Sequence, residues 1–261
     1  MLKAVLSIDV EHTFEAAPEG VHAFLDLLGE LGIRATFFCT TSVLERNPDV
    51  IRALRESPHE IASHGAHHSE MDKGNKQCLT QLEPSGIPGI IEESKAAFDR
   101  EGIEIKGFRA MSLQTNPLIL SEVEKFFDYD SSLLSRVPPH IDPATPKLVR
   151  VPVTRLMARG MPYSSSALMG MGPAALAAAA HTTRGLETVV CYAHCFDLAG
   201  CPVEGLNVAG WKKQYYYRRC GPSQKAFFTE WVKQLRAQGR QFLTCAEIAN
   251  AVPGQTPSDT Q

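Results

Sequence analysis

The stretch Val5-Leu6-Ser7-Ile8-Asp9-Val10-Glu11 opens the chain with a short apolar run that ends in two carboxylates. The run from Val5 to Ile8 predicts a first core strand. Residues i and i+2 of an extended segment point to the same side, so Asp9 and Glu11 would project together into one cavity. Their repulsion requires a cation or a shared proton. One carboxylate could then ligate a metal while the other acts as a general base; the alternative is a solvated strand end.

Apolar runs and helical patterns alternate along the rest of the chain. Further strands are predicted at 35–39, 60–63, 106–110, 129–133, 148–153, 189–193 and 241–244, and helices at 20–31, 48–56, 90–100, 117–127, 174–181 and 227–238, with a loop at 72–89. This alternation favours a parallel sheet under an outer layer of helices, closed or nearly closed. We therefore expect a single α/β domain, with a barrel spanning 1–252 and a flexible tail at 253–261.

The composition is that of an ordinary globular protein and narrows the classes of partner. Hydrophobic residues make up 44% of the 261 residues and charged residues 21%, and the formal charge is −3. This charge gives no reason to expect nucleic acid as a partner. No apolar run is long enough to span a bilayer, and the N-terminal stretch lacks the features of a signal peptide. We expect a cytoplasmic protein.

The seven cysteines form an odd set without a disulfide-type framework. Cys191, Cys195 and Cys201 crowd around His194, but a zinc site usually shows tighter pairs. Buried reduced thiols are therefore the expectation, with a cysteine metal site as the alternative.

Two histidines follow the third predicted strand. His64 and His68 are four residues apart, a spacing that places both rings on one face of a helical turn. Two neutral imidazoles and one carboxylate are a common catalytic metal set that leaves positions open for water. The alternative is a cluster of histidines on the surface. In barrels of this kind the active site lies at the C-terminal ends of the strands, where these residues fall.

An arginine and a third histidine end two later strands. Arg109 could hold a carboxylate in a fixed orientation and keep it ionised, or it could be a surface arginine. His194 follows the apolar run 189–193 and suits a general acid, with Asp197 adjusting its pKa. The alternative is a core histidine that is satisfied by backbone groups.

Several of these segments, in this order, resemble motifs of the polysaccharide deacetylases of carbohydrate esterase family 4. The matching segments are 7–11, in the family's Asp-x-Glu form, 32–38, the histidine motif at 59–68, the arginine motif at 107–112, 129–132, 151–154 and 192–194 with Asp197. The stretch 211–224 resembles the branch associated with exopolysaccharide clusters.

The resemblance implies a distorted (β/α)7-type TIM-like barrel and a metal-dependent hydrolase that removes acetyl groups, mostly from N-acetylated sugars. Carried over by position, the metal ligands are Glu11, His64 and His68, and Zn²⁺ is the expected ion, with Co²⁺, Ni²⁺ or Mn²⁺ as alternatives. By the same carry-over, Asp9 is the general base, Arg109 holds Asp9, and His194 is the general acid.

Three further residues are expected to support this site. Asp130 belongs to a matching segment, and Asp197 accompanies His194. The backbone N–H near Ser112 is expected to help stabilise the tetrahedral oxyanion.

The chain departs from the family pattern around the expected substrate side. Val10 separates two acidic residues that are commonly adjacent aspartates, and Met111 replaces a common proline. Cys195-Phe196 stands where a proline–tryptophan pair is common, and 169–172 replaces a more glycine-rich or polar stretch. These differences indicate an unusual substrate.

Three functions are compatible with the sequence. The first is an N-deacetylase acting on a small-molecule or lipid-linked N-acetylated sugar. Residues Trp211 to Arg219 would approach its phosphorylated or lipid-linked head group, or would simply begin a helix with exposed basic residues. The second is another C–N hydrolase on this scaffold, such as a deformylase or a cyclic amide or ureide hydrolase. The third is a non-catalytic sugar-binding relative, although such a module need not keep acid, base and metal ligands together.

Overall fold

The computed structural model describes residues 1–11, 17–65, 78–156, 160–169, 171, 173–199 and 220–254. Its strands are short, and most of them follow the apolar runs of the sequence. They are β1 (Lys3–Val10), β2 (Thr36–Cys39), β3 (Glu60–Ser63), β4 (Gly107–Phe108), β5 (Tyr129–Asp130), β6 (Leu134–Ser135), β7 (His140–Asp142), β8 (Thr145–Arg150), β9 (Val153–Thr154), β10 (Thr188–His194) and β11 (Gln241–Phe242).

The main sheet is a curled, mostly parallel sheet. Its strand order is β10-β1-β2-β3-β4-β5-β8-β7, with β11 beside the start of β1. In the described residues every pairing of this sheet is parallel except β7 with β8, and β6 and β9 form a second, two-stranded parallel sheet. The backbone N–H of Val190 on β10 donates to the Thr154 hydroxyl on β9 at 2.9 Å, so β9 lies beside β10 and the curl nearly closes. The prediction of a single α/β domain with a distorted TIM-like barrel is confirmed.

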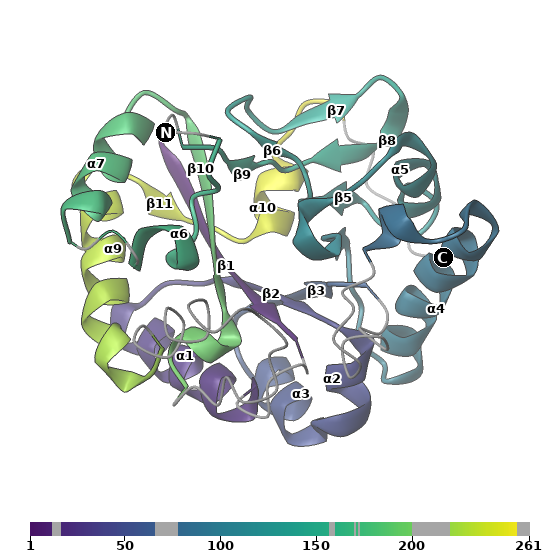
Figure 1. The fold of residues 1–261 in the computed structure, drawn as a ribbon, viewed down its shortest axis with the longest axis horizontal. Coiled ribbons are helices and arrows are strands. Elements are labelled where there is room, and N and C mark those ends of the chain that lie inside the picture. Colours follow the sequence, from purple (N-terminus) through teal and green to yellow (C-terminus); the bar gives the residue numbers. More distant parts are fainter. Residues whose placement is uncertain are drawn as a thin grey trace.

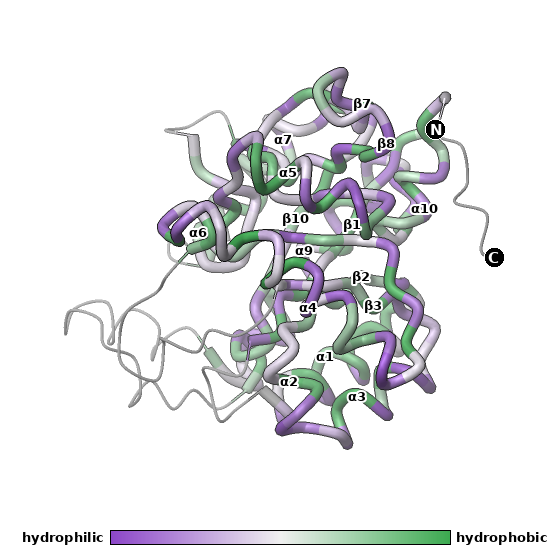
Figure 2. Tube along the Cα trace, turned by 90° about the vertical axis from the view of Figure 1, so that its right-hand side faces the viewer, coloured by the Kyte–Doolittle hydropathy of each residue, from purple (hydrophilic) through white to green (hydrophobic). Residues whose placement is uncertain are grey.

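Helices surround this sheet on the outside (Figure 1). The α-helices are α1 (Ala17–Leu31), α2 (Thr41–Arg46), α3 (Pro48–Arg55), α4 (Ile87–Arg100), α5 (Pro117–Val123), α6 (Ser165–Met169), α7 (Pro173–Thr183), α9 (Lys225–Ala237) and α10 (Cys245–Asn250). Short 3₁₀ helices are η2 (Leu79–Gln81), η3 (Pro84–Gly86), η4 (Met111–Leu113), η5 (Cys195–Asp197) and η7 (Pro222–Gln224). Outer helices such as α1 and α3 carry both hydrophobic and hydrophilic stretches (Figure 2).

Strand β1 is buried on both faces, and the alternation of its side chains decides which of them face the inside of the barrel. Ile8 and Val10 belong to the outer core between sheet and helices, whereas Val5 belongs to the inner core with Phe38. Because successive side chains alternate, the odd-numbered positions of β1 face the inside of the barrel. The pair Asp9 and Glu11 continues this inner row beyond Val5.

Some elements differ from those predicted. The strand expected at 148–153 is two strands, because Pro152 has no backbone N–H and β8 ends before it, while β9 begins after it in the other sheet. Helix α4 starts at Ile87, inside the expected loop 72–89. The helices α2, α6 and α10 and the strands β6 and β7 had no counterpart among the predicted elements, and β7 pairs antiparallel with β8. Within the described ranges no helix is long and apolar enough to cross a membrane. The expected tail from residue 253 stays a prediction.

Candidate active site

Residues from four strands meet at the C-terminal edge of the barrel. Asp9 and Glu11 come from the end of β1, where Asp9 lies in register with His194 of β10. His64 directly follows β3, and Arg109 directly follows β4. Asp9, Glu11, His64 and Arg109 are all buried. The sheet order places β1 between β10 and β2 and places β4 beyond β3, so this edge collects side chains that are far apart in the sequence.

The Arg109 side chain supports Asp9 from inside the barrel. Its Nη1 donates to Asp9 Oδ1 at 2.7 Å, and its Nε and Nη2 donate to the carbonyl and hydroxyl oxygens of Ser131 at 3.2 and 3.0 Å. The guanidinium lies 4.0 Å from the centre of the Phe38 ring. A charge-assisted hydrogen bond between two buried groups fixes the carboxylate firmly. Asp9 is therefore held in one orientation by a fully buried cation.

The His64 imidazole is oriented on both of its nitrogens. Nδ1 lies 2.9 Å from the backbone carbonyl of Arg109, and Nε2 lies 3.2 Å from Glu11 Oε1 and 3.9 Å from Asp9 Oδ2. A carbonyl oxygen only accepts hydrogen bonds, so Nδ1 carries a proton. Burial alone would lower the pKa of His64, but the carboxylates of Asp9 and Glu11 raise it above its usual value. In the neutral ring the Nε2 lone pair points at two carboxylates.

These side chains are of types that bind divalent cations, but in the described part of the chain no three His, Cys, Asp or Glu side chains stand in an arrangement that could hold a metal ion. An imidazole nitrogen and two carboxylates converge, and the backbone carbonyl of Arg109 fixes the ligand tautomer in the way that metal-binding histidines commonly require. Imidazole nitrogen and carboxylate oxygen atoms are suitable ligands for Zn²⁺ and similar divalent ions. His68, the third expected ligand, lies outside the described residues, as do 170, 172 and 211–219. The structure thus brings Glu11 and His64 together, and the role of His68 stays a prediction.

Asp130 organises the loop that follows β4. It is buried beside Arg150, whose Nε lies 3.0 Å from Oδ2, and it accepts the Ser132 hydroxyl at 2.5 Å. The Ser132 hydroxyl in turn accepts the backbone N–H of Ala110 at 2.7 Å. Burial raises the pKa of the Asp130 carboxyl, while Arg150 and Ser132 oppose the rise. Asp130 therefore acts on the arginine-bearing loop through Ser132.

Ser112 lies exposed at the turn of this loop. Its φ of 58° and the φ of 57° at Leu113 are both left-handed, a conformation that costs free energy for residues other than glycine. The neighbouring Met111 is buried. Two consecutive left-handed residues turn the backbone sharply at the edge of the site; the expected contribution of the Ser112 N–H to oxyanion binding stays a prediction.

Asp197 accompanies His194 by bonding its backbone, while the His194 ring contacts Ser166; the expected effect of Asp197 on the pKa of His194 stays a prediction. Asp197 Oδ2 accepts the backbone N–H of His194 at 2.9 Å and the Ser165 hydroxyl. The ring Nδ1 lies instead 3.3 Å from the Ser166 hydroxyl oxygen, and the Phe196 ring stacks on the imidazole with centroids 4.8 Å apart. Burial raises the pKa of Asp197, while the neighbouring His194 opposes the rise. Ser165 and Ser166 were missed from the sequence, where the only signal was three consecutive serines.

The cysteines of the described chain are reduced. Cys39, Cys78, Cys191, Cys195 and Cys245 are buried and Cys220 is partly exposed. Burial raises the pKa of Cys195 and that of Cys245 to about 12, which keeps both as thiols at neutral pH. Cys201, the third member of the alternative cysteine metal site, lies outside the described residues.

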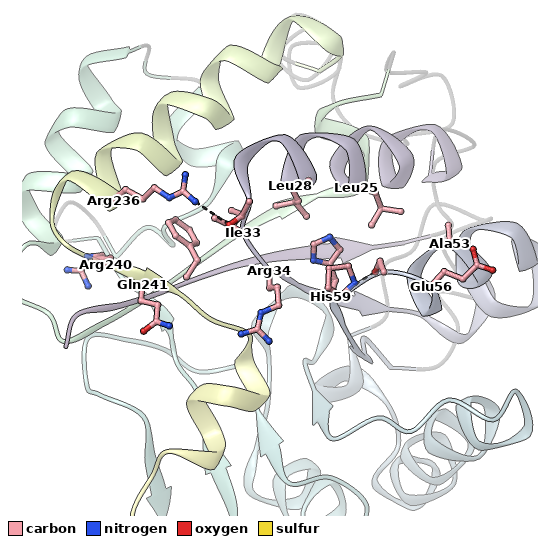
Figure 3. Close-up of a pocket in the computed structure, with 15 residues that line it drawn as sticks. Leu25, Leu28, Ile33, Arg34, Ala53, Glu56, His59, Arg236, Arg240 and Gln241 are labelled. Atoms are coloured by element: carbon pink, nitrogen blue, oxygen red, sulfur yellow. Dashed lines mark hydrogen bonds between the residues drawn. The ribbon is translucent and has the colours of Figure 1, made fainter.

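A cavity of about 810 Å³ lies near the opposite, N-terminal edge of the sheet (Figure 3). The arginine side chains that line this cavity form hydrogen bonds or ion pairs with other groups of the protein. Arg236 and Arg240 donate to the last carbonyls of α1 and α7, and Arg34 pairs with Glu247 at 2.6 Å. Cations at helix C-termini offset the helix dipole. These arginines therefore serve the packing of helix ends, and the candidate site residues gather at the other edge.

Comparisons with known proteins identify a family match for part of the chain and a shared fold. Residues 6–126 match the family model described as polysaccharide deacetylase. No curated protein sequence matches the chain.

Solved structures of this family share the fold at low sequence identity. A CE4 family pseudoenzyme from Bacillus anthracis aligns with a TM-score of 0.61 and 12% identity over 96% of this chain and 66% of its own length, so this chain spans about two thirds of that protein. A peptidoglycan N-acetylglucosamine deacetylase aligns with a TM-score of 0.56 and 14% identity, over 94% of this chain and 87% of its own. A family 4 carbohydrate esterase from Streptomyces lividans aligns with a TM-score of 0.51 and 17% identity, over 93% and 91%. Residues 6–126 therefore match the polysaccharide deacetylase family by sequence, and the chain has the fold of solved structures from that family.

Proposed function

We propose that this protein is a metal-dependent hydrolase that removes the N-acetyl group of an amino sugar or glycan precursor. The observation that carries the proposal is the cluster at the C-terminal edge of the barrel. There Arg109 holds Asp9, and His64 presents Nε2 to Glu11 and Asp9. The family match over residues 6–126 supports the same activity.

A divalent ion held by Glu11, His64 and His68 would act as a Lewis acid on the amide oxygen and would lower the pKa of a water molecule. Side chains of the protein then accept and donate the protons of the reaction. Asp9 accepts a proton from the attacking water, and Arg109 supplies the counter-charge for its carboxylate. His194 gives a proton to the leaving nitrogen as the C–N bond breaks, so that acetate and a free amine result.

Two other functions use the same scaffold. A deformylase or a cyclic amide hydrolase would need the same acid, base and metal ligands and would differ in the acyl pocket beside Met111. A non-catalytic sugar-binding protein would need none of them. One of the similar structures is described as a pseudoenzyme, so a protein with this fold can be non-catalytic. The buried ion pair of Asp9 and Arg109 beside His64 favours catalysis, since taking both charges out of water is costly and sugar binding alone does not require it. A cytoplasmic location and a nucleotide-linked or lipid-linked substrate stay predictions.

The test is hydrolysis by protein that has been loaded with one equivalent of Zn²⁺, Co²⁺, Ni²⁺ or Mn²⁺. The panel contains N-acetyl and N-formyl amino sugars, their nucleotide-linked forms and cyclic amides, and the release of amine and acid is measured. We expect acetate from an N-acetylated sugar, and we expect formate or ring opening only if the second function holds.

Matched variants identify the roles in that assay. Asp9→Asn should lower kcat by about 10²–10⁴-fold and retain the metal. His64→Ala should lose the metal as well as turnover, whereas His140→Ala, on β7, should change neither. Full turnover by Asp9→Asn, or no hydrolysis by any metal-loaded protein, would contradict the proposal.

A further inference from the structure

The segment Ser164-Ser165-Ser166 packs along strand β10, and each of its hydroxyls has a separate partner. The Ser164 hydroxyl accepts the backbone N–H of Ala167 at the start of α6. The Ser165 hydroxyl donates to Asp197. The Ser166 hydroxyl lies 3.3 Å from Nδ1 of His194.

The backbone fixes this segment against the strand that carries His194. Ser164 forms a parallel bridge with Tyr192 of β10, and the Tyr192 N–H donates to the Tyr163 carbonyl at 3.1 Å. Ser164 and Ser165 are fully buried. The position of Ser166 relative to the His194 ring is therefore set by strand pairing and by the start of a helix.

Other contacts of His194 within the described residues hold the ring plane and the backbone. Phe196 stacks on the imidazole at a centroid distance of 4.8 Å and an angle of 16°, and Tyr192 meets it edge-on at 5.5 Å. Asp197 accepts the backbone N–H of His194. The hydroxyl of Ser166 thus adds a polar contact at one ring nitrogen, which the stacking contacts cannot provide.

We propose that Ser166 is a positioning residue that accepts a hydrogen bond from Nδ1–H of His194 and so reserves Nε2 for proton transfer. The inference rests on the proposed function, in which His194 protonates the leaving nitrogen. A protonated imidazole that gives up its Nε2 proton keeps the proton on Nδ1. Because a hydroxyl oxygen can accept from Nδ1–H before and after that transfer, Ser166 holds the ring throughout the reaction. The proton moves from Nε2 to the amine nitrogen, and Ser166 itself is unchanged.

The first test observes the tautomer of the ring and needs no substrate. Protein labelled with ¹⁵N-histidine is studied by long-range ¹H–¹⁵N NMR, and the His194 signals are assigned by their loss in His194→Ala. We expect the neutral ring of the wild type to carry its proton on Nδ1. Ser166→Ala should move the population toward the Nε2–H tautomer that a free imidazole prefers. Ser166→Thr, which keeps the hydroxyl, should restore the wild-type spectrum.

Two further variants separate the contact from general effects on folding. Ser166→Cys conserves size but replaces oxygen with a weak acceptor, so it should behave like Ser166→Ala. Ser121→Ala removes another helical serine, on α5, whose hydroxyl donates to the Leu118 carbonyl, and it should leave the His194 signals unchanged. Wild-type His194 signals in both Ser166→Ala and Ser166→Cys would overturn the inference.

The second test is kinetic. On a substrate that the wild type hydrolyses, Ser166→Ala should lower kcat about tenfold with KM unchanged, and Ser166→Thr should recover the rate. A wild type that turns over while Ser166→Ala keeps both the wild-type kcat and the wild-type tautomer overturns the positioning role alone. A ring that responds to Ser166 in a protein that hydrolyses no substrate of the panel overturns the proposed function and leaves the contact in place.

Discussion

The Arg109 guanidinium is fully buried, and its nearest anionic partner is Asp9. Removal of one member of a buried ion pair leaves the other charge without compensation, which costs about 3–5 kcal/mol. Arg109→Met, which roughly conserves volume, should therefore lower the free energy of unfolding by that amount. Arg109→Lys keeps the charge but loses the forked geometry toward Ser131, so its loss should be smaller. Urea denaturation measures both variants.

A double variant identifies the cause of that loss. If the uncompensated Asp9 carboxylate is responsible, Arg109→Met combined with Asp9→Asn should recover part of the free energy of unfolding that Arg109→Met loses. Purely additive losses in the double variant would contradict the explanation.

The partly buried Glu60 carboxylate predicts how stability changes with pH. Burial raises its pKa, although it accepts hydrogen bonds from the Thr36 and Tyr129 hydroxyls and the backbone N–H of Ala246 at 2.7, 2.8 and 3.0 Å. With a folded-state pKa above the unfolded value, the folded state binds more protons than the unfolded state across this window. The contribution of Glu60 to stability is thus full below about pH 4.5 and falls as the pH rises through the folded-state pKa.

The matching experiment is urea denaturation between pH 4 and about pH 7. Relative to Glu60→Gln, the wild type should lose stability as the pH rises through this window. Glu101→Gln, at an exposed position, should follow the wild-type curve. Parallel curves for the wild type and Glu60→Gln would show that Glu60 does not titrate in this way.

The sequence predicts residue pairs that lie on one strand better than pairs that lie on different elements. Asp9 and Glu11 could be placed together because alternation along a strand fixes their sides. The partner of the His194 ring could not be found in this way. The nearest carboxylate in sequence, Asp197, is drawn to the backbone by the tight η5 turn, and Ser166 reaches the ring from a separate short helix.

The close contact between α1 and η5 depends on Gly20. A Cβ atom at this position would lie 1.9 Å from the backbone carbonyl oxygen of Cys195, which is the residue after His194. Gly20→Ala must therefore displace either the helix or the turn. We expect a loss of about 1–3 kcal/mol in the free energy of unfolding and a fall in kcat, since the turn carries the proposed general acid.

Gly29 provides a matched control on the same helix. A Cβ atom there would meet nothing within 4 Å, and the position is exposed. Gly29→Ala should stabilise the protein by about 0.4–1 kcal/mol by removing backbone freedom from the unfolded chain. Thermal denaturation and initial rates distinguish the two substitutions, and equal effects of both would refute the contact argument.

Elements with long apolar runs were predicted well, and short capped elements were not. The parallel strands β1, β2, β3 and β10 follow runs that are buried on both faces. Helix α10 was missed because its six residues show little periodicity. Its signal was the capping box, in which the Thr244 hydroxyl accepts the N–H of Glu247 and the Glu247 carboxylate accepts the N–H of Thr244.

The candidate site exists only when the barrel is folded. Glu11 and His64 lie on separate strands, β2 lies between them, and Arg109 joins them from β4. No local segment can assemble this set of ligands in the unfolded chain. Any ion that binds here must therefore stabilise the entire fold.

Metal binding should raise the melting temperature of protein that has first been stripped of metal with a chelator. At a Zn²⁺ concentration a hundred times the Kd, binding should add about 2.7 kcal/mol to the free energy of unfolding. For a chain of this size that corresponds to a rise in Tm of about 5–10 °C.

Glu11→Gln and His64→Ala, each of which removes one proposed ligand, should lose most of this rise, because the cluster at the barrel edge then offers too few donors. His140→Ala should keep it, because its ring lies beside the Pro138 carbonyl, away from the cluster. Calorimetry with and without added chelator measures the shift, and an equal rise in His64→Ala and in the wild type would place the ion elsewhere.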